Sequence, residues 1–305
     1  LLQTLAADHG FNDAELGWVR TQLRAAERVP KLIESEQQAK EKTLTWTAYR
    51  KIHLGDKTVE RGRAFLAEHR DTLARAESDY GVPASVIVAI LGVETKYGAY
   101  TSPHRVLDAL TTQGFEHPTR ADFFFSELVA FFALSRERGW EPRQIKGSYA
   151  GALGMAQFMP SNYRRLALDY DNDGHRDLWS PTDAIGSIAR YFNEYDRTRA
   201  WKRGEAIVLP ASTPPVELLT TLPRNGRRTD TTLGVLEAAG LITARSGDPH
   251  QPAGALELVL DQGSEWWIGL PNFYAIQTYN PRVYYAMSVT QLAQALETPA
   301  KGETP

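Results

Sequence analysis

The most restrictive feature of this sequence is a nearly unbroken apolar run from Val82 to Gly98, which contains one acidic residue, Glu94. Proline suits the first turn of a helix and glycine suits its end, so Pro83 and Gly98 predict the limits of one helix. At about 100° per residue, Glu94 lies on the same face as Leu91. Because a helix that is apolar all round belongs in a core, the chain is expected to fold around this segment.

The carboxyl group of Glu94 has two interpretations. A buried carboxylate without a partner is costly and tends to stay protonated near neutral pH. A protonated carboxyl at the rim of an apolar core is what a general acid requires, which makes Glu94 a candidate catalytic residue. The alternative is a carboxylate that reaches solvent at the helix end or joins an ion-pair network.

Composition excludes several classes of function. The 305 residues are enough for one large core or for two or three domains. A net charge of −3 gives no electrostatic case for a nucleic-acid partner. The lack of cysteine excludes disulfides, thiol catalysis and zinc–thiolate sites. No apolar run has the ~18 residues of a membrane span. The start at Leu1, without a signal-like region, is consistent with removal of a targeting segment.

Helical periodicity covers most of the chain. Asn12 and Glu15 have the spacing of a capping box at the start of a helix. Further helices are predicted at 57–80, 82–98, 120–136, 183–194 and 283–296. The pattern therefore predicts a mainly α protein.

Composition changes after Trp201. Residues 209–215 and 222–229 have the composition of loops. Residues 256–258 and 265–268 are predicted strands on either side of a turn at 261–264, and 273–279 is predicted as a third strand. This indicates a small antiparallel β subdomain from about Trp201 to Tyr279, so the fold class is α+β with a dominant helical part.

Residues 146–161, KGSYAGALGMAQFMPS, combine glycines with other small residues, which lets neighbouring groups approach closely. The segment is not a phosphate loop, because no Gly-Lys-Ser/Thr follows the glycines. Ser148 and Gln157 are its candidate hydrogen-bonding side chains. The alternative is a tightly packed loop without chemistry.

Residues 169–183, DYDNDGHRDLWSPTD, predict a calcium loop. Acidic residues occupy its positions 1, 3 and 5, and Gly174 occupies position 6, where the sharp turn needs glycine. Ser180 stands where a standard EF-hand has glutamate, so the closing carboxylate is assigned three residues later. The candidate ligands are Asp169, Asp171, Asp173, His175 (through its backbone carbonyl) and Asp183. Hard oxygen ligands favour structural Ca²⁺ over softer metals. The alternative is a surface turn rich in Asx motifs.

Four segments in order resemble the lytic transglycosylase B family of bacterial cell-wall enzymes. They are GVETKYG at 92–98, KGSYAGALGMAQFMPS at 146–161, the run at 169–192, and GLPNFYAIQTYN at 269–280. The resemblance implies a lysozyme-like helical core, an additional helical domain and a small β domain. We accordingly assign 1–68 to the N-terminal helical region, 69–200 to the catalytic core with its modified EF-hand loop, 201–282 to the β subdomain, and 283–305 to a C-terminal helix and tail.

The resemblance also implies residue roles. Glu94 corresponds to the family's catalytic acid/base and Asp183 to the closing ligand of its metal loop. Residues implied to contact substrate are Ser148, Gln157, Tyr191, Tyr49, Asn272 and Tyr279.

The reaction implied is a non-hydrolytic cleavage of the β-1,4 bond between N-acetylmuramic acid and N-acetylglucosamine in peptidoglycan, with 1,6-anhydromuramic ends. No organic cofactor is implied. The expected location is the periplasm, either soluble or tethered to the outer membrane by an N-terminal lipid outside this chain. Two alternatives stay open: a lysozyme-type muramidase, which needs a second carboxylate or a placed water, and a non-catalytic, calcium-stabilised glycan-binding protein.

Overall fold

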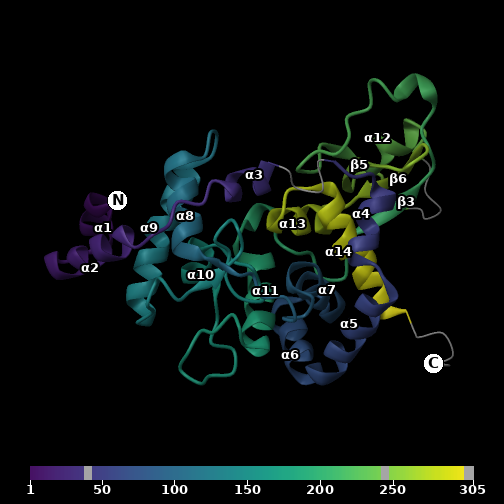
Figure 1. Cartoon of the computed structure of the whole chain (residues 1–305). Helices are drawn as coiled ribbons and strands as arrows, with labels where there is room; N and C mark the ends of the chain where they lie inside the picture. Colours follow the sequence, from purple (N-terminus) through teal and green to yellow (C-terminus); the bar gives the residue numbers. More distant parts are fainter. Residues whose placement is uncertain (38–42, 242–246, 299–305) are drawn as a thin grey trace. The chain divides into compact units, whose positions relative to one another are not determined.

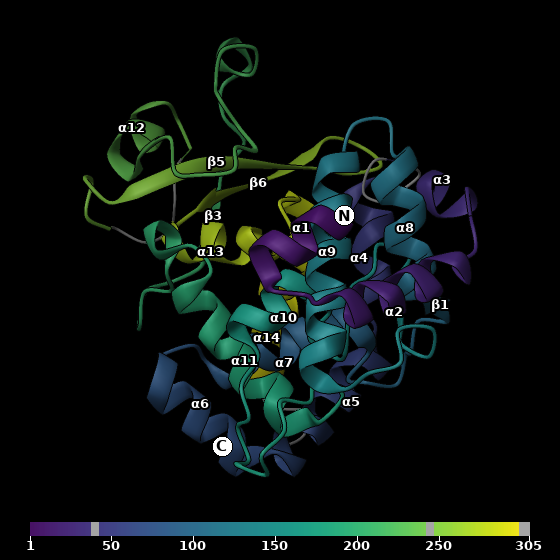
Figure 2. The ribbon, with the colours of Figure 1, turned by 90° about the vertical axis from the view of Figure 1, so that its left-hand side faces the viewer.

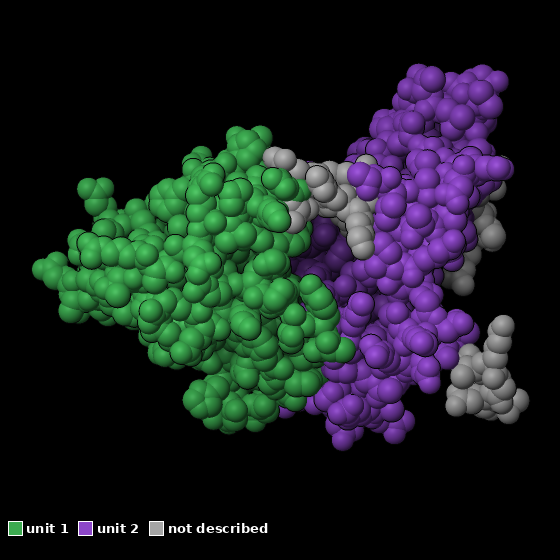
Figure 3. Space-filling view, viewed as in Figure 1, with its two compact units in different colours: residues 1–39, 98–187 green, residues 40–97, 188–305 purple. Residues whose placement is uncertain are grey.

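The computed structural model describes residues 1–37, 43–241 and 247–298, and Figure 1 shows the order of their helices and strands. The chain divides into two compact units, each made of two separate stretches of sequence (Figure 3). Unit 1 comprises residues 1–39 and 98–187, and unit 2 comprises 40–97 and 188–305. The sequence-based boundaries at 68, 200 and 282 stay a prediction, since units made of interleaved stretches do not test them.

Unit 1 is almost entirely helical. Its elements are α1 (Leu2–His9), α2 (Asp13–Arg24), α3 (Lys31–Gln37), β1 (His104–Arg105), α8 (Val106–Glu116), α9 (Ala121–Arg138), β2 (Lys146–Gly147), α10 (Pro160–Leu166) and the first half of α11 (Pro181–Glu194). The long helix α9 packs against α8, α10 and α1, and α8 lies beside it in Figure 2. Phe131 and Leu134 of α9 are fully buried, so this helix forms the middle of the unit's core.

Unit 2 combines helices with a small sheet. Its helices are α4 (Trp46–His53), α5 (Asp56–Glu68), α6 (Arg70–Tyr80), α7 (Ala84–Thr95), the second half of α11, η2 (Arg197–Arg199), η3 (Val216–Leu218), α12 (Leu233–Ala238), α13 (Pro271–Tyr279) and α14 (Val283–Glu297). Helix α7 contacts α5, α6 and α14. Every residue from Ser85 to Gly92 is buried, so the predicted central helix is confirmed.

The end of α7 differs from its predicted limit. The helix stops at Thr95, because Lys96, Tyr97 and Gly98 all have positive φ angles, of 51°, 62° and 81°. This turn brings the phenol ring of Tyr97 back onto Gly92, where an added Cβ would lie 2.7 Å from the ring. A glycine at position 92 is therefore required for the turn that follows the helix.

The other predicted helices are confirmed with one change. The Asn12–Glu15 capping box is present. The predicted helix at 57–80 is two helices, α5 and α6, which meet at His69, whose φ and ψ of −106° and 24° are not helical. Among the described residues no single helix has the length and apolar composition of a membrane span. Helices α6 and α7 together have that length and apolar composition, but the pair is bent by 113°.

The β subdomain is confirmed, and one of its predicted strands is wrong. Its antiparallel sheet has the order β3 (Val208–Ala211), β6 (Ser264–Gly269), β5 (Pro252–Val259), β4 (Thr231–Thr232). Residues 273–279 belong instead to α13, which has Pro271 in its first turn. Residues 272–277 of this helix are all buried. A short run of buried residues shows neither the helical period of 3.6 nor the strand period of 2, so the sequence does not distinguish the two structures. Strand β3 lies in a segment predicted to be a loop.

Candidate functional site

Glu94 lies in the last turn of α7 and is half-buried. Its Oε1 accepts a hydrogen bond of 2.5 Å from the hydroxyl of Tyr285, which is in the first turn of the neighbouring helix α14. Tyr285 is 3% exposed. The packing of α14 on α7 thus fixes one carboxylate oxygen against a buried phenol.

Two further tyrosines complete a cluster around this pair. Tyr279, at the end of α13, and Tyr191, on α11, have ring centroids 4.6 Å apart. The hydroxyl of Tyr191 donates to the backbone oxygen of Thr278 at 2.7 Å, and its ring stacks on Tyr195 at 4.4 Å. Helices α11, α13 and α14 of unit 2 therefore bring their phenols to one place, beside the carboxylate from α7.

Burial raises the pKa of both Tyr279 and Tyr285 well above the ordinary value for a phenol, and the negative charge of Glu94 raises each pKa further. Both phenols consequently keep their protons at neutral pH, and that of Tyr285 donates to Glu94. The site pairs one carboxylate with a neutral donor.

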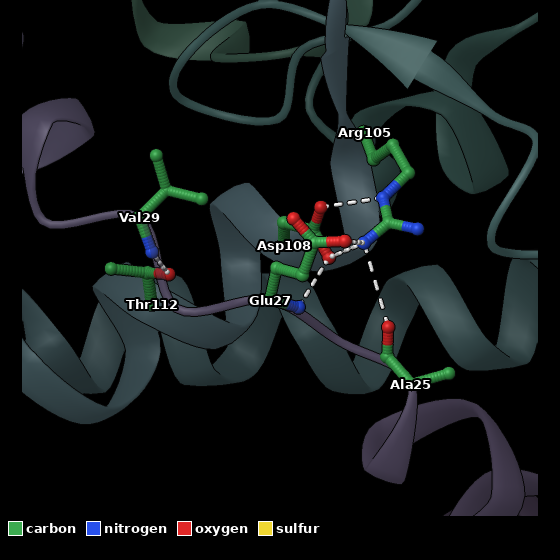
Figure 4. Close-up of polar contacts among 6 residues, drawn as sticks. All are labelled: Ala25, Glu27, Val29, Arg105, Asp108 and Thr112. Atoms are coloured by element: carbon green, nitrogen blue, oxygen red, sulfur yellow. Dashed lines mark hydrogen bonds and ion pairs between the residues drawn. The ribbon is translucent and has the colours of Figure 1, made fainter.

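Three other acidic side chains have partners within unit 1 that occupy their carboxylates. Asp108 accepts from the Nε of Arg105 at 2.5 Å and from the backbone N–H of Glu27 at 2.8 Å (Figure 4). Glu116 pairs with Arg28 at 2.6 Å. The carboxylate of Glu127 accepts from both the backbone N–H and the hydroxyl of Ser161, at 2.9 and 2.6 Å. Each of the three holds a helix or a connecting segment in place.

The acidic loop between α10 and α11 brings three carboxylates together. Ligand oxygens of Asp169, Asp171 and Asp183 all lie within 4.8 Å of one another. Asp183 is 1% exposed and accepts the backbone N–H groups of Tyr170 and Asp177, both at 2.6 Å. The turn at Gly174 has a φ of 91°, as position 6 of a calcium loop requires.

The electrostatics of this cluster fit a cation. Burial raises the pKa of Asp183, and the charge of Asp171 raises it further, while backbone N–H groups lower it. In the described part of the chain no Lys or Arg pairs with Asp169, Asp171 or Asp183. Converging hard oxygen donors without a cationic side chain suit Ca²⁺. The side chains of Asp173 and His175 lie outside this group, and the carboxylate of Asp173 accepts the N–H of His175. The role of the His175 backbone carbonyl stays a prediction.

Residues 1–294 match the family described as "Transglycosylase SLT domain". Over 296 residues the chain is 38% identical to the membrane-bound lytic murein transglycosylase B of Escherichia coli (strain K12), a match that covers 94% of this chain and 79% of that protein. The chain belongs to the transglycosylase SLT domain family.

Solved structures agree with this assignment to the transglycosylase SLT domain family. The structure of the catenated lytic transglycosylase SltB1 from Pseudomonas aeruginosa matches with a TM-score of 0.87 and 41% identity, over 97% of this chain and 95% of that one. Escherichia coli Slt35, solved in complex with calcium, matches with a TM-score of 0.84 and 37% identity, over 97% and 90% of the two chains. The predicted family, the lysozyme-like and mainly helical fold, and the enzyme class of lytic transglycosylase are confirmed.

The predicted site residues of this transglycosylase SLT domain fall into both units. Glu94, Tyr191 and Tyr279 meet in unit 2, whereas Ser148 and Gln157 belong to unit 1. The hydroxyl of Ser148 accepts the backbone N–H groups at positions 150 and 152. The amide of Gln157 donates to the backbone oxygen of residue 154 at 2.8 Å. Both side chains stabilise the glycine-rich turn within unit 1.

Two other residues implied to contact substrate are buried. Tyr49 packs among Trp46, His53 and Tyr284. Asn272 is fully buried, accepts from the backbone N–H of residue 202 and donates to the backbone oxygens at 202 and 205. Through these contacts both side chains stabilise the fold of unit 2. Their roles in binding a substrate stay predictions.

Sequence reasoning did not identify Tyr285. A signal for it was present, since this tyrosine begins the buried face of a predicted helix that continues through Val289 and Leu292. A buried phenol needs a hydrogen-bond partner. In this transglycosylase that partner is Glu94, which is 191 residues away in sequence.

Proposed function

We propose that this chain cleaves the β-1,4 bond between N-acetylmuramic acid and N-acetylglucosamine in murein, and that the product carries a 1,6-anhydromuramic end. Family membership and the murein named for the Escherichia coli relative support the substrate. The observation that carries the mechanism is the contact between Glu94 and Tyr285, which holds one carboxyl group at the end of a buried helix.

In this mechanism Glu94, protonated, donates its proton to the glycosidic oxygen, and the bond from that oxygen to the anomeric carbon breaks. The carboxylate that results takes the proton of the muramoyl 6-hydroxyl, and that oxygen attacks the anomeric carbon of the same sugar. An intramolecular nucleophile has a high effective concentration, so no water is activated. The neutral hydroxyl of Tyr285 keeps the carboxyl group of Glu94 oriented both before and after it loses its proton.

The hydrogen bonding of three other carboxylates is consistent with a single acid/base group. A retaining or inverting hydrolase uses a second carboxylate as nucleophile or base. Asp108, Glu116 and Glu127 are each occupied by hydrogen bonds or an ion pair within unit 1. This favours the intramolecular reaction over the muramidase.

We also assign a structural Ca²⁺ to the acidic loop, held by Asp169, Asp171 and Asp183, with Asp173 and the carbonyl of His175 as the further predicted ligands. The cation would neutralise the converging carboxylates. The calcium complex of Slt35 supports this assignment. Asp183 is also in the first turn of α11, the helix that carries Tyr191, so a filled loop would stabilise the start of that helix.

With murein as the proposed substrate, the expected location of the enzyme is the periplasm. Glycan strands of peptidoglycan are its expected partners. The relatives include a membrane-bound protein from Escherichia coli and the soluble SltB1 from Pseudomonas aeruginosa, so both forms stay open.

The decisive experiment digests purified sacculi with the wild-type enzyme and with Glu94→Gln, and identifies the products by mass spectrometry. We expect muropeptides from the wild type that are lighter by one water than hydrolysed ones, and almost none from the variant. Glu116→Gln, which alters an exposed ion pair, is the matched control and should retain activity. Reducing-end muropeptides would instead identify a hydrolase, and activity in Glu94→Gln would remove the proposed acid.

A further inference from the structure

A cavity of about 620 Å³ lies in unit 1, on the side of the acidic loop that follows its glycine. One wall comes from the end of α9 and the residues after it, one from α10, and one from residues 174–179 of the loop, which Figure 1 shows between α10 and α11. Its lining contains neither Glu94 nor any residue of the tyrosine cluster. It is therefore separate from the site described above.

The cavity has an aromatic wall. The indole of Trp179 is 39% exposed, which is high for so large an apolar side chain. The ring of Trp140 meets it edge to face at 5.8 Å, and Tyr163 meets Trp140 edge to face at 5.5 Å. Burial raises the pKa of Tyr163 to about 12, so its hydroxyl stays neutral and donates to a backbone oxygen at 2.6 Å. These contacts hold the exposed face of Trp179 in a fixed orientation.

The charged groups around this wall balance one another. Arg138 and Arg176 each donate to a backbone oxygen, at 2.7 and 3.3 Å. Glu137 pairs with Arg164 at 2.6 Å, and the carboxylate of Asp177 accepts the N–H of Trp179 at 2.9 Å. Two cationic and two acidic residues therefore line the cavity, and all four are engaged within the protein. This arrangement suits a neutral polar ligand better than an anion.

A sugar ring combines these requirements. It is neutral, it has an apolar C–H face that can lie on an indole, and its rim of hydroxyl and amide groups can reach charged hydrogen-bonding groups. We propose that this cavity, with Trp179 as its platform, is a second glycan-binding site for β-1,4-linked N-acetylhexosamine chains.

A second site changes how the enzyme meets an insoluble polymer. This role rests on the proposed function, because the glycan strand is the substrate named there. When one chain holds two sites for the same polymer, the second contact forms at a high effective concentration. The cavity would thus raise the affinity for sacculi without altering the cleavage of short fragments.

The first test detects the site directly. In the Glu94→Gln protein labelled with 15N-tryptophan, seven indole N–H signals are expected, and tri-N-acetylchitotriose is the probe. The signal of Trp179 is identified by its loss in Trp179→Phe. We expect the Trp179 and Trp140 signals to shift together and to saturate. If the Trp179 signal does not move at millimolar probe, the proposal is wrong.

The second test measures function with sacculi. In a sedimentation assay, Trp179→Ala should bind sacculi about tenfold more weakly, as expected for loss of an aromatic anchor. Trp179→Phe should restore most of the binding, because it keeps an aromatic face. Phe115→Ala, at a phenylalanine on α8 that is 59% exposed and outside the cavity, is the matched control.

The products separate this proposal from the proposed reaction. Trp179→Ala should release anhydro products from short soluble glycans at the wild-type rate. Equal binding by Trp179→Ala and Phe115→Ala would overturn the second site and leave the reaction intact. Shifts at Trp179 without anhydro products from the wild type would support the second site and overturn the reaction.

Discussion

At the scale of single residues, the contact that most constrains the chemistry joins the hydroxyl of Tyr285 to Glu94. Removing that hydroxyl leaves the ring in place and removes one hydrogen bond that orients the carboxyl group of Glu94. We expect Tyr285→Phe to lower kcat on sacculi about tenfold, the effect of losing one hydrogen bond to a charged group. KM should change little. Product release measured over time at several sacculus concentrations separates the two constants.

The adjacent tyrosine provides the control. The hydroxyl of Tyr284 accepts the backbone N–H of Val259 on β5 at 3.2 Å. Tyr284→Phe removes the same atom from the same turn of α14 without touching Glu94. Its kcat should equal that of the wild type, and an equal loss in both variants would argue against an orienting role for Tyr285.

A second prediction at this scale concerns Glu127, which is 4% exposed on α9. Burial raises the pKa of its carboxyl group, although hydrogen bonds from Ser161 lower it in part. The folded state therefore holds this proton more tightly than the unfolded state does. Its contribution to stability is complete below the ordinary carboxyl pKa and is lost as pH rises through the raised pKa.

The variant Glu127→Gln keeps the shape of the side chain and cannot ionise. The unfolding free energy of the wild type should consequently fall relative to that of Glu127→Gln as pH rises from about 4 to 7. Urea unfolding at several pH values measures this difference. A difference that is constant with pH would show that Glu127 ionises normally in the folded protein.

Single residues differ in how far sequence alone could place them. Glu94 was predictable because one acidic group stands out in a long apolar run. Tyr285 was not, because its importance depends on a contact between helices far apart in sequence. The burial of Asn272 also depends on tertiary structure, since its partners lie about seventy residues earlier.

At the scale of elements, helices with clear signals were predicted well. Helix α7 was recognised by its apolar length and by Pro83, and α2 by its capping box. Helix α13 was mistaken for a strand because its residues are buried on every side, which removes the period that distinguishes the two structures. Strand β3 was missed because a strand of four residues containing a proline has little signal of its own.

The acidic loop is the element with the sharpest test. Binding of Ca²⁺ to the folded state alone should stabilise the protein by about 3 kcal/mol at a hundredfold excess over the dissociation constant. We expect Ca²⁺ to raise the melting temperature by several degrees, chelation to reverse the rise, and Asp171→Asn to abolish most of it. Asp171 is exposed, so this substitution removes a ligand charge with little other change.

Asp177→Asn is the matched control for the loop. This residue is exposed in the same loop, and its carboxylate lies outside the converging group. It should keep the response to Ca²⁺. If both variants respond as the wild type does, or if Mg²⁺ raises the melting temperature equally, the loop is not a calcium site.

At the scale of the whole molecule, the chain passes between the units three times, because each unit consists of two separate stretches. Periodicity, caps and motifs depend on residues that are close in sequence. They therefore predict single helices and strands, but not which separate stretches of the chain form one unit. The segment at 25–29 shows what completes unit 1: Arg105 donates to the backbone oxygen of Ala25, and the N–H groups of Glu27 and Val29 donate to Asp108 and Thr112 (Figure 4).

The N-terminal stretch thus contacts α8 through a buried carboxylate, Asp108, and through an exposed ion pair between Arg28 and Glu116. Variants of the two acidic residues can therefore be compared directly. Asp108 is 6% exposed, and its loss removes the ion pair with Arg105 and leaves the Glu27 N–H without its acceptor. We expect Asp108→Ala to lower the unfolding free energy by about 2 kcal/mol and to expose residues 25–29 to proteolysis. Glu116 is on the same helix as Asp108, and Glu116→Ala breaks its exposed ion pair with Arg28. This variant should change neither measurement, since exposed ion pairs contribute little to stability. Equal effects of the two variants would mean that the buried pair does not hold the N-terminal stretch onto unit 1.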